Sequence, residues 1–120
     1  MKKILALVAL SLATVFVLTA CAPAAAPIVV AQGTVIIDVR TPAEFAGGHL
    51  EGAVNIDVQS GDFASAISQL PTDDTYIIYC KSGNRSGQAM TQMTSLGFTD
   101  MVNAGSVAAA SSATGIAIVQ

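Results

Sequence analysis

The chain has 120 residues, of which 52% are hydrophobic and only 11% are charged, with a net charge of −3. This composition excludes an intrinsically disordered chain, and the acidic balance argues against a nucleic-acid partner. Two cysteines form one disulfide at most, and with a single histidine they are too few ligands for a typical zinc site. Neither a disulfide framework nor a metal site is therefore expected.

Residues 1–20 have the profile of a secretory signal peptide. Lys2 and Lys3 precede an apolar run over residues 4–18, in which only Ser11 and Thr14 are polar. A membrane-spanning helix needs about 20 apolar residues, and this run is shorter. The pattern therefore favours a signal peptide over a membrane-spanning helix.

The segment Leu18-Thr19-Ala20-Cys21 resembles the bacterial lipoprotein signal. The resemblance implies cleavage before Cys21, whose thiol then carries a diacylglyceryl group with acyl chains such as palmitate. The alternatives are an ordinary secretory signal cut nearby and an uncleaved anchor. Residues 21–33, rich in Ala and Pro, are expected to be a tether. The expected location is extracytoplasmic, with the lipid anchored in the bacterial cell membrane.

Beyond the tether, short β-type runs alternate with runs of helical periodicity. This alternation predicts an α/β domain over residues 34–120, in which a parallel β-sheet is flanked by helices. The expected strands cover residues 34–39, 53–56, 76–79 and 98–102, and helices are expected over residues 43–45, from residue 63, around residues 89–96 and in the Ala- and Ser-rich tail.

Individual residues indicate where these helices begin and end. Thr41, followed by Pro42, is expected to cap the first helix. Asp62 is expected to cap the second helix, which Pro71 ends. Gly97 is expected to adopt a left-handed conformation after the third helix. The apolar stripes are Phe63, Ile67 and Leu70 on the second helix and Ala89, Met93 and Leu96 on the third.

The segment after the third expected strand carries the most reactive side chain. Cys80 ends this strand, and Lys81 and Arg85 are two of the three cations that remain without the signal peptide. Nearby cations and a helix N-terminus both lower the pKa of a cysteine. The pattern predicts a reactive thiolate in an anion-attracting loop at the carboxyl edge of the sheet. The alternative is a buried structural cysteine beside solvated loop charges.

Three sequence blocks occur in a recognisable order. They are Ile37-Asp38-Val39-Arg40 with Glu44-Phe45, Gly48-His49-Leu50-Glu51-Gly52-Ala53-Val54-Asn55-Ile56, and Tyr79-Cys80-Lys81-Ser82-Gly83-Asn84-Arg85-Ser86. In these blocks the chain resembles the rhodanese-like sulfurtransferases. The resemblance implies a small α/β domain and a persulfide-forming nucleophile at Cys80. It also implies a substrate-binding loop whose N–H groups point at the transferred sulfur, formed by Lys81, Ser82, Gly83, Asn84 and Arg85.

Three further positions match the framework of this family. Asp38 and Arg40 lie two apart on a strand and share a face, so an orienting ion pair is expected rather than chemistry. His49 is expected to fix a loop by hydrogen bonds. The C-terminal region departs from the family, because Ser106 follows Gly105 and Ala110 stands near the position of a usual Trp.

The resemblance implies a sulfurtransferase that needs no cofactor. Cys80 would take a sulfane sulfur from a small anionic donor such as thiosulfate, or from a persulfide, and pass it to a thiophilic acceptor. A protein thiol is one candidate acceptor, and a membrane-tethered relay or binding module is the alternative function. A Cys-dependent phosphatase or arsenate reductase is less consistent, since those enzymes place one residue more between Cys and Arg than the four found here.

Overall fold

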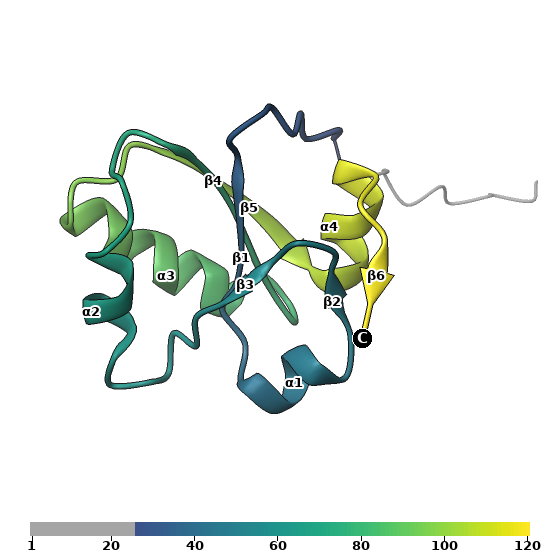
Figure 1. Ribbon diagram of the computed structural model, residues 1–120, viewed down its shortest axis with the longest axis horizontal. Coiled ribbons are helices and arrows are strands. Elements are labelled where there is room, and N and C mark those ends of the chain that lie inside the picture. Colours follow the sequence, from purple (N-terminus) through teal and green to yellow (C-terminus); the bar gives the residue numbers. More distant parts are fainter. Residues whose placement is uncertain (1–25) are drawn as a thin grey trace, which may run out of the picture.

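A parallel sheet with the strand order β3-β1-β4-β5 lies at the centre of the computed structural model, which describes residues 26–120 (Figure 1). The sheet consists of β1 (Val35–Asp38), β3 (Val54–Asn55), β4 (Thr75–Cys80) and β5 (Asp100–Ser106). The helices are α1 (Pro42–Ala46), α2 (Phe63–Ile67), α3 (Asn84–Ser95) and α4 (Val107–Thr114). The expected α/β class, with a parallel sheet flanked by helices, is confirmed.

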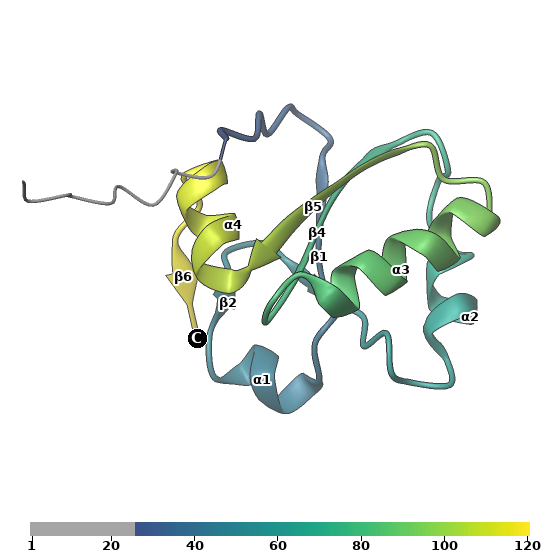
Figure 2. The same cartoon turned by 180° about the vertical axis from the view of Figure 1, so that it is seen from behind.

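Successive side chains of the central strands enter two separate cores. Cys80 belongs to the larger core, with Ile37, Val39, Val58, Phe63, Ile67, Tyr76, Ile78, Ala89, Met93 and Phe98. The smaller core contains Ile36, Leu50, Ile77, Tyr79, Ala104 and Ala110. Helices α2 and α3 therefore cover one face of the sheet and α4 covers the other (Figures 1 and 2). Strands buried on both faces explain the nearly continuous apolar runs in the sequence.

The N-terminus of α1 has the predicted cap. Thr41 is extended, its hydroxyl accepts from the N–H of Glu44, and the Glu44 carboxylate accepts from the N–H of Thr41, which completes a capping box. The expected cap of α2 is wrong, because Asp62 makes no side-chain capping bond. Its backbone lies at φ −94° and ψ 1°, not in the extended conformation that a capping side chain usually requires.

The end of α3 agrees only in part with what the sequence predicts. Gly97 has a φ of +98°, as the left-handed conformation requires. Leu96 is 42% exposed and does not belong to the buried stripe, because α3 ends at Ser95. Strand β5 begins later than expected, since Phe98 turns into the larger core and packs edge-on against Tyr76.

A second, two-stranded sheet was not expected from the sequence. It pairs β2 (His49–Leu50) with β6 (Ile118–Val119) in antiparallel orientation. The C-terminal helix forms as expected, with Ser106 capping α4 and the small residues Ala110 and Ala113 facing the core. Ala110 thus contributes only a methyl group at this buried position.

The predicted signal peptide, Cys21 and the first part of the predicted tether lie outside the described residues. Within the tether, Ile28 donates a backbone hydrogen bond to Ala113 of α4 and packs against the smaller core. Contacts with the domain therefore begin before Thr34. No helix in residues 26–120 is long and apolar enough to cross a membrane.

Candidate active site

The loop between β4 and α3 lies at the carboxyl edge of the parallel sheet. Cys80 is the last residue of β4, and Asn84 is the first residue of α3. Between them Gly83 has a φ of +94°, which side chains disfavour. A Cβ at Gly83 would also lie 3.4 Å from the Cα of Gly105 on the neighbouring strand. Glycine therefore allows the loop to turn sharply against β5.

This turn surrounds the Cys80 sulfur with hydrogen-bonding groups. The N–H of Gly83 donates to Sγ at 3.0 Å, and the Ser86 hydroxyl lies 3.5 Å from Sγ. Burial raises the pKa of the Cys80 thiol, but the Ser86 hydroxyl and the backbone N–H groups of Ser86, Ser82 and Gly83 outweigh it. Together they lower the pKa from an ordinary value of 9.0 to about 7. A substantial thiolate population at neutral pH follows.

Arg85 is tied to α1. Its guanidinium forms two parallel hydrogen bonds with the Glu44 carboxylate, each 2.8 Å long. Arg85 holds the pKa of Glu44 well below its usual range. Because Glu44 also belongs to the capping box with Thr41, one carboxylate joins the start of α1 to the start of α3. In the sequence, the only feature that indicates this role of Glu44 is its place in the first of the three sequence blocks.

Lys81 differs from the other cations of the described segment. It is exposed and has no ion pair within residues 26–120, whereas Arg40 and Arg85 each have one. Ser82 and Asn84 are also exposed, and the Ser82 hydroxyl accepts from the N–H of Asn84. Of the predicted loop residues, Gly83 makes the shortest hydrogen bond to the sulfur. Within residues 26–120, Lys81 is the cation without an ionic partner and is therefore available to an anion.

The framework residues have the expected structural roles. Asp38 is fully buried, and its Oδ2 lies 2.6 Å from Nη2 of Arg40. The same Nη2 donates to the carbonyl of Gly48 at 2.7 Å, so the pair fixes the chain after α1. His49 donates from Nδ1 to the carbonyl of Phe45 and stacks on its ring at 3.7 Å. The orienting ion pair and the loop-fixing histidine are confirmed.

Asn103 of β5 was missed by the sequence analysis. Its amide nitrogen donates to the carbonyl of Gly83 at 3.0 Å. Its amide oxygen accepts from the Ser86 hydroxyl at 2.7 Å and from the N–H of Gly105 at 3.0 Å. No local motif marks Asn103, because its contacts depend on the alignment of β5 beside β4.

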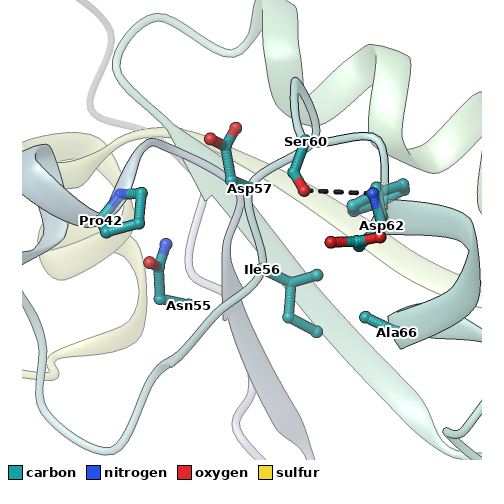
Figure 3. A pocket seen from close by; sticks show the side chains of 8 residues that line it. Pro42, Asn55, Ile56, Asp57, Ser60, Asp62 and Ala66 are labelled. Carbon is teal, nitrogen blue, oxygen red and sulfur yellow. Dashed lines mark hydrogen bonds between the residues drawn. The ribbon is translucent and has the colours of Figure 1, made fainter.

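A pocket of about 370 Å³ lies between the loop after β3 and the start of α2 (Figure 3). Ile56, Phe63 and Ala66 give it apolar walls, and the carboxylates of Asp57 and Asp62 lie along it. No residue from Cys80 to Arg85 lines this pocket. The pocket is therefore not lined by the loop between β4 and α3, and its acidic side chains disfavour a small anion.

The depressed pKa of Cys80 predicts a pH profile for alkylation by iodoacetamide. The rate is expected to fall as pH decreases through about 7, because protonation removes the nucleophilic thiolate. Between pH 7 and 9 the rate is expected to rise only about twofold, whereas that of an ordinary thiol would rise far more. Mass spectrometry of the Cys80 peptide measures the rate, and a midpoint near 9 would contradict this account.

The protein is thus an α/β protein with a hydrogen-bonded cysteine between a parallel strand and the start of a helix, at the sheet edge where active sites of such folds commonly lie. Comparison of the domain with models of known protein families identifies the particular family. The model of the rhodanese-like domain family matches residues 25–110, and the chain belongs to this family.

Several proteins that are similar in sequence to this chain are named as sulfurtransferases. The Escherichia coli thiosulfate sulfurtransferase PspE is 36% identical over 69 residues, which are 58% of this chain and 66% of that protein. A probable adenylyltransferase/sulfurtransferase MoeZ of Mycobacterium tuberculosis is 37% identical over 68 residues, covering 57% of this chain and only 17% of that protein. The chain thus matches less than two thirds of either relative.

Solved structures of a rhodanese and of a rhodanese-like domain are similar to this chain. A rhodanese from E. coli, solved with anions, has a TM-score of 0.60 and 30% sequence identity, covering 72% of this chain and 98% of that one. The rhodanese-like domain of the Alr3790 protein from Anabaena has a TM-score of 0.64 at 23% identity, covering 74% and 89%. The second likeness supports the fold alone.

Proposed function

We propose that this protein transfers a sulfane sulfur through a persulfide on Cys80. The observation that carries the proposal is the hydrogen-bonded sulfur, which accepts from the N–H of Gly83 and has a pKa near 7. A nucleophile with a pKa close to the working pH combines ionisation with reactivity. Membership of the rhodanese-like family, with relatives named as thiosulfate sulfurtransferases, supports the same reaction class.

The first half-reaction loads the sulfur. The Cys80 thiolate attacks the outer sulfur of thiosulfate, a new S–S bond forms, and the bond to the departing sulfite breaks with its electron pair. The product is a Cys80 persulfide anion and free sulfite. The N–H of Gly83 is placed to stabilise negative charge in this loop.

The second half-reaction returns the enzyme to its starting form. A thiolate or cyanide attacks the outer sulfur of the persulfide, and the Cys80 sulfur leaves as a thiolate. The acceptor thus becomes a persulfide or thiocyanate. The low pKa of Cys80 favours this step because a less basic thiolate is a better leaving group.

Turnover with thiosulfate and cyanide tests this function. We expect thiocyanate and sulfite to form in equal amounts, since each cycle releases one sulfite when Cys80 is loaded and one thiocyanate when cyanide removes the sulfur. Absence of both products would contradict thiosulfate sulfurtransferase activity. A persulfide donor, tested in parallel, measures whether the loop accepts sulfur from an organic donor.

Lys81 is proposed to attract the anionic donor. Replacing Lys81 with glutamine is expected to raise KM for thiosulfate about fivefold, because one screened charge contributes about 1 kcal/mol. The kcat should change less, and Lys81→Arg should restore KM. Steady-state kinetics at low ionic strength measure both constants. An unchanged KM in Lys81→Gln would assign donor binding to other groups, such as Arg85.

A relay to a protein acceptor is a second candidate function. The match to a small part of the much longer MoeZ protein favours it, because a domain of this family there belongs to a larger chain. After loading with labelled thiosulfate, the protein would pass its label to proteins of a membrane extract faster than to small thiols. Transfer only to small thiols would contradict the relay.

We further propose that lipid on Cys21 anchors the protein outside the cytoplasm. The proposal rests on the order of the basic start, apolar run and Leu18-Thr19-Ala20-Cys21. Cys21→Ser should move the protein from the membrane fraction to the soluble fraction. Unchanged fractionation, or a native mass without lipid, would contradict the anchor.

A further inference from the structure

Asn103 approaches the active-site loop at an irregularity in β5. The register pairs Ile78 with Asn103 but Tyr79 with Gly105, so β5 contains one residue more than β4 at this point. Gly105 has a φ of +78°, which is consistent with a β-bulge. Bulges commonly redirect side chains beside active sites, and here the Asn103 amide bonds to both Gly83 and Ser86.

Its hydrogen bonds define the orientation of the Asn103 amide. The backbone N–H of Gly105 can only donate, so the amide atom facing it must be the oxygen. The carbonyl of Gly83 can only accept, so the atom facing it must be the nitrogen. The atom of Asn103 nearest the Ser86 hydroxyl is consequently an acceptor.

The Ser86 hydroxyl has a single hydrogen to share among three neighbours. The amide oxygen of Asn103 lies 2.7 Å away, the carbonyl of Gly83 3.0 Å and the Cys80 sulfur 3.5 Å. When that hydrogen points at Asn103, a lone pair of the hydroxyl faces Sγ. This arrangement suits a neutral S–H group, which donates, whereas a thiolate requires the hydroxyl to rotate and donate to sulfur.

We propose that Asn103 is a positioning residue that competes with the Cys80 thiolate for the hydrogen of Ser86, and thereby sets the ionised fraction of Cys80. The amide oxygen cannot donate, so it always opposes rotation of the hydroxyl toward sulfur. Because Asn103 is exposed, water can replace a deleted amide. Water can donate as well as accept, and therefore does not impose the same orientation on Ser86.

Several charged groups lie on Cys80's own loop and on the neighbouring elements, and they remain unchanged in the test. Arg85 on α3 is paired with Glu44 on α1, and Asp38 on β1 is paired with Arg40. Lys81 is in the loop itself, and Asp57 follows β3. On β5, Asp100 lies at the opposite end of the strand, where it accepts from Thr75. A comparison of Asn103 variants with and without the Ser86 hydroxyl cancels the influence of these groups.

A double-mutant cycle measures the competition, with Asn103→Ala and Ser86→Ala as the two changes. The thiolate absorbance in the ultraviolet, followed against pH, reports the Cys80 pKa. Asn103→Ala is expected to lower this pKa by about one unit when Ser86 is present, because it removes the nearer of the two oxygen acceptors that draw the hydroxyl hydrogen away from the thiolate, and leaves only the carbonyl of Gly83. With Ser86→Ala in the background, the same change should shift the pKa by less than about 0.3 units. Gln92→Ala, which removes an exposed amide from α3, is the matched control.

No decrease in the pKa, or an equal decrease in both backgrounds, would overturn the proposal. If Asn103→Ala does not fold, Asn103→Asp provides a nearly isosteric second variant. Its carboxylate should raise the pKa of Cys80, and by more with Ser86 than with Ser86→Ala. An equal rise in both backgrounds would leave only charge repulsion and would also overturn the proposal.

The importance of this competition for sulfur transfer rests on the proposed function, but the pKa cycle does not. If both hold, Asn103→Ala shifts the acidic limb of the sulfur-loading rate to lower pH by the same interval as the pKa. If the protein does not transfer sulfur, the thiolate titration still gives its result. The two proposals therefore fail separately.

Discussion

Cys80→Ser is expected to abolish sulfur loading and to reduce turnover with thiosulfate and cyanide by at least about a thousandfold. The serine hydroxyl is far less acidic than the thiol, so it supplies no anionic nucleophile at neutral pH. It also cannot form the S–S bond on which the proposed cycle depends. Thiocyanate formation measures the loss.

Two controls separate this chemical effect from misfolding. Serine differs from cysteine by one atom, so the variant should keep a cooperative unfolding transition close to that of the wild type. Cys21→Ser removes the other cysteine of the chain and should leave turnover unchanged. Full turnover in Cys80→Ser would refute a persulfide on this residue.

Asp38→Asn is expected to lower the free energy of unfolding by about 3 kcal/mol. Asp38 is fully buried and accepts from the N–H, Nε and Nη2 of Arg40. Asparagine removes the negative charge and leaves the buried guanidinium of Arg40 without an ionic partner. Urea denaturation with the same slope for both proteins measures the change.

Glu44→Gln is the matched control for this prediction. It also breaks an ion pair, with Arg85, but the side chains of that pair are 19% and 29% exposed. Glutamine preserves the capping box, so we expect a cost of less than about 1 kcal/mol. Equal costs for the two variants would contradict the argument that burial makes the Asp38–Arg40 pair the more important one.

The elements that depend on local sequence were predicted well. The β-branched and aromatic runs of β1 and β4 are nearly continuous, and the start of α1 has a complete capping box. Gly97 ends α3 through its own backbone conformation. These signals lie within a few residues of the structure that they specify, so the surrounding fold was not needed to interpret them.

Two local predictions were wrong, the cap at Asp62 and the buried position of Leu96, and the remaining unpredicted features depend on distant partners. The pairing of β2 with β6 joins segments far apart in the chain, and each strand is only two residues long. Asn103 reaches Ser86 only because β5 lies beside β4 and contains a bulge. Arg85 was expected to hold an anion, but the structure pairs its guanidinium with Glu44, and anion binding by Arg85 stays a prediction.

For Cys80, the sequence predicts that the pKa is lowered, and the structure shows which contacts lower it. The sequence placed Cys80 at the end of a strand before a helix, and cations suggested a lowered pKa. In the structure, burial acts against that lowering, and hydrogen bonds from Ser86 and the loop N–H groups produce it. The expected direction therefore has a different main cause.

The most direct measurement is the mass of the protein after incubation with thiosulfate, followed by removal of the excess donor and peptide mapping. We expect the addition of one sulfur atom, located on the peptide that contains Cys80 and released as thiocyanate by cyanide. Cys80→Ser should gain no sulfur. An unchanged wild-type mass, or a sulfur atom that maps to another residue, would contradict a persulfide on Cys80.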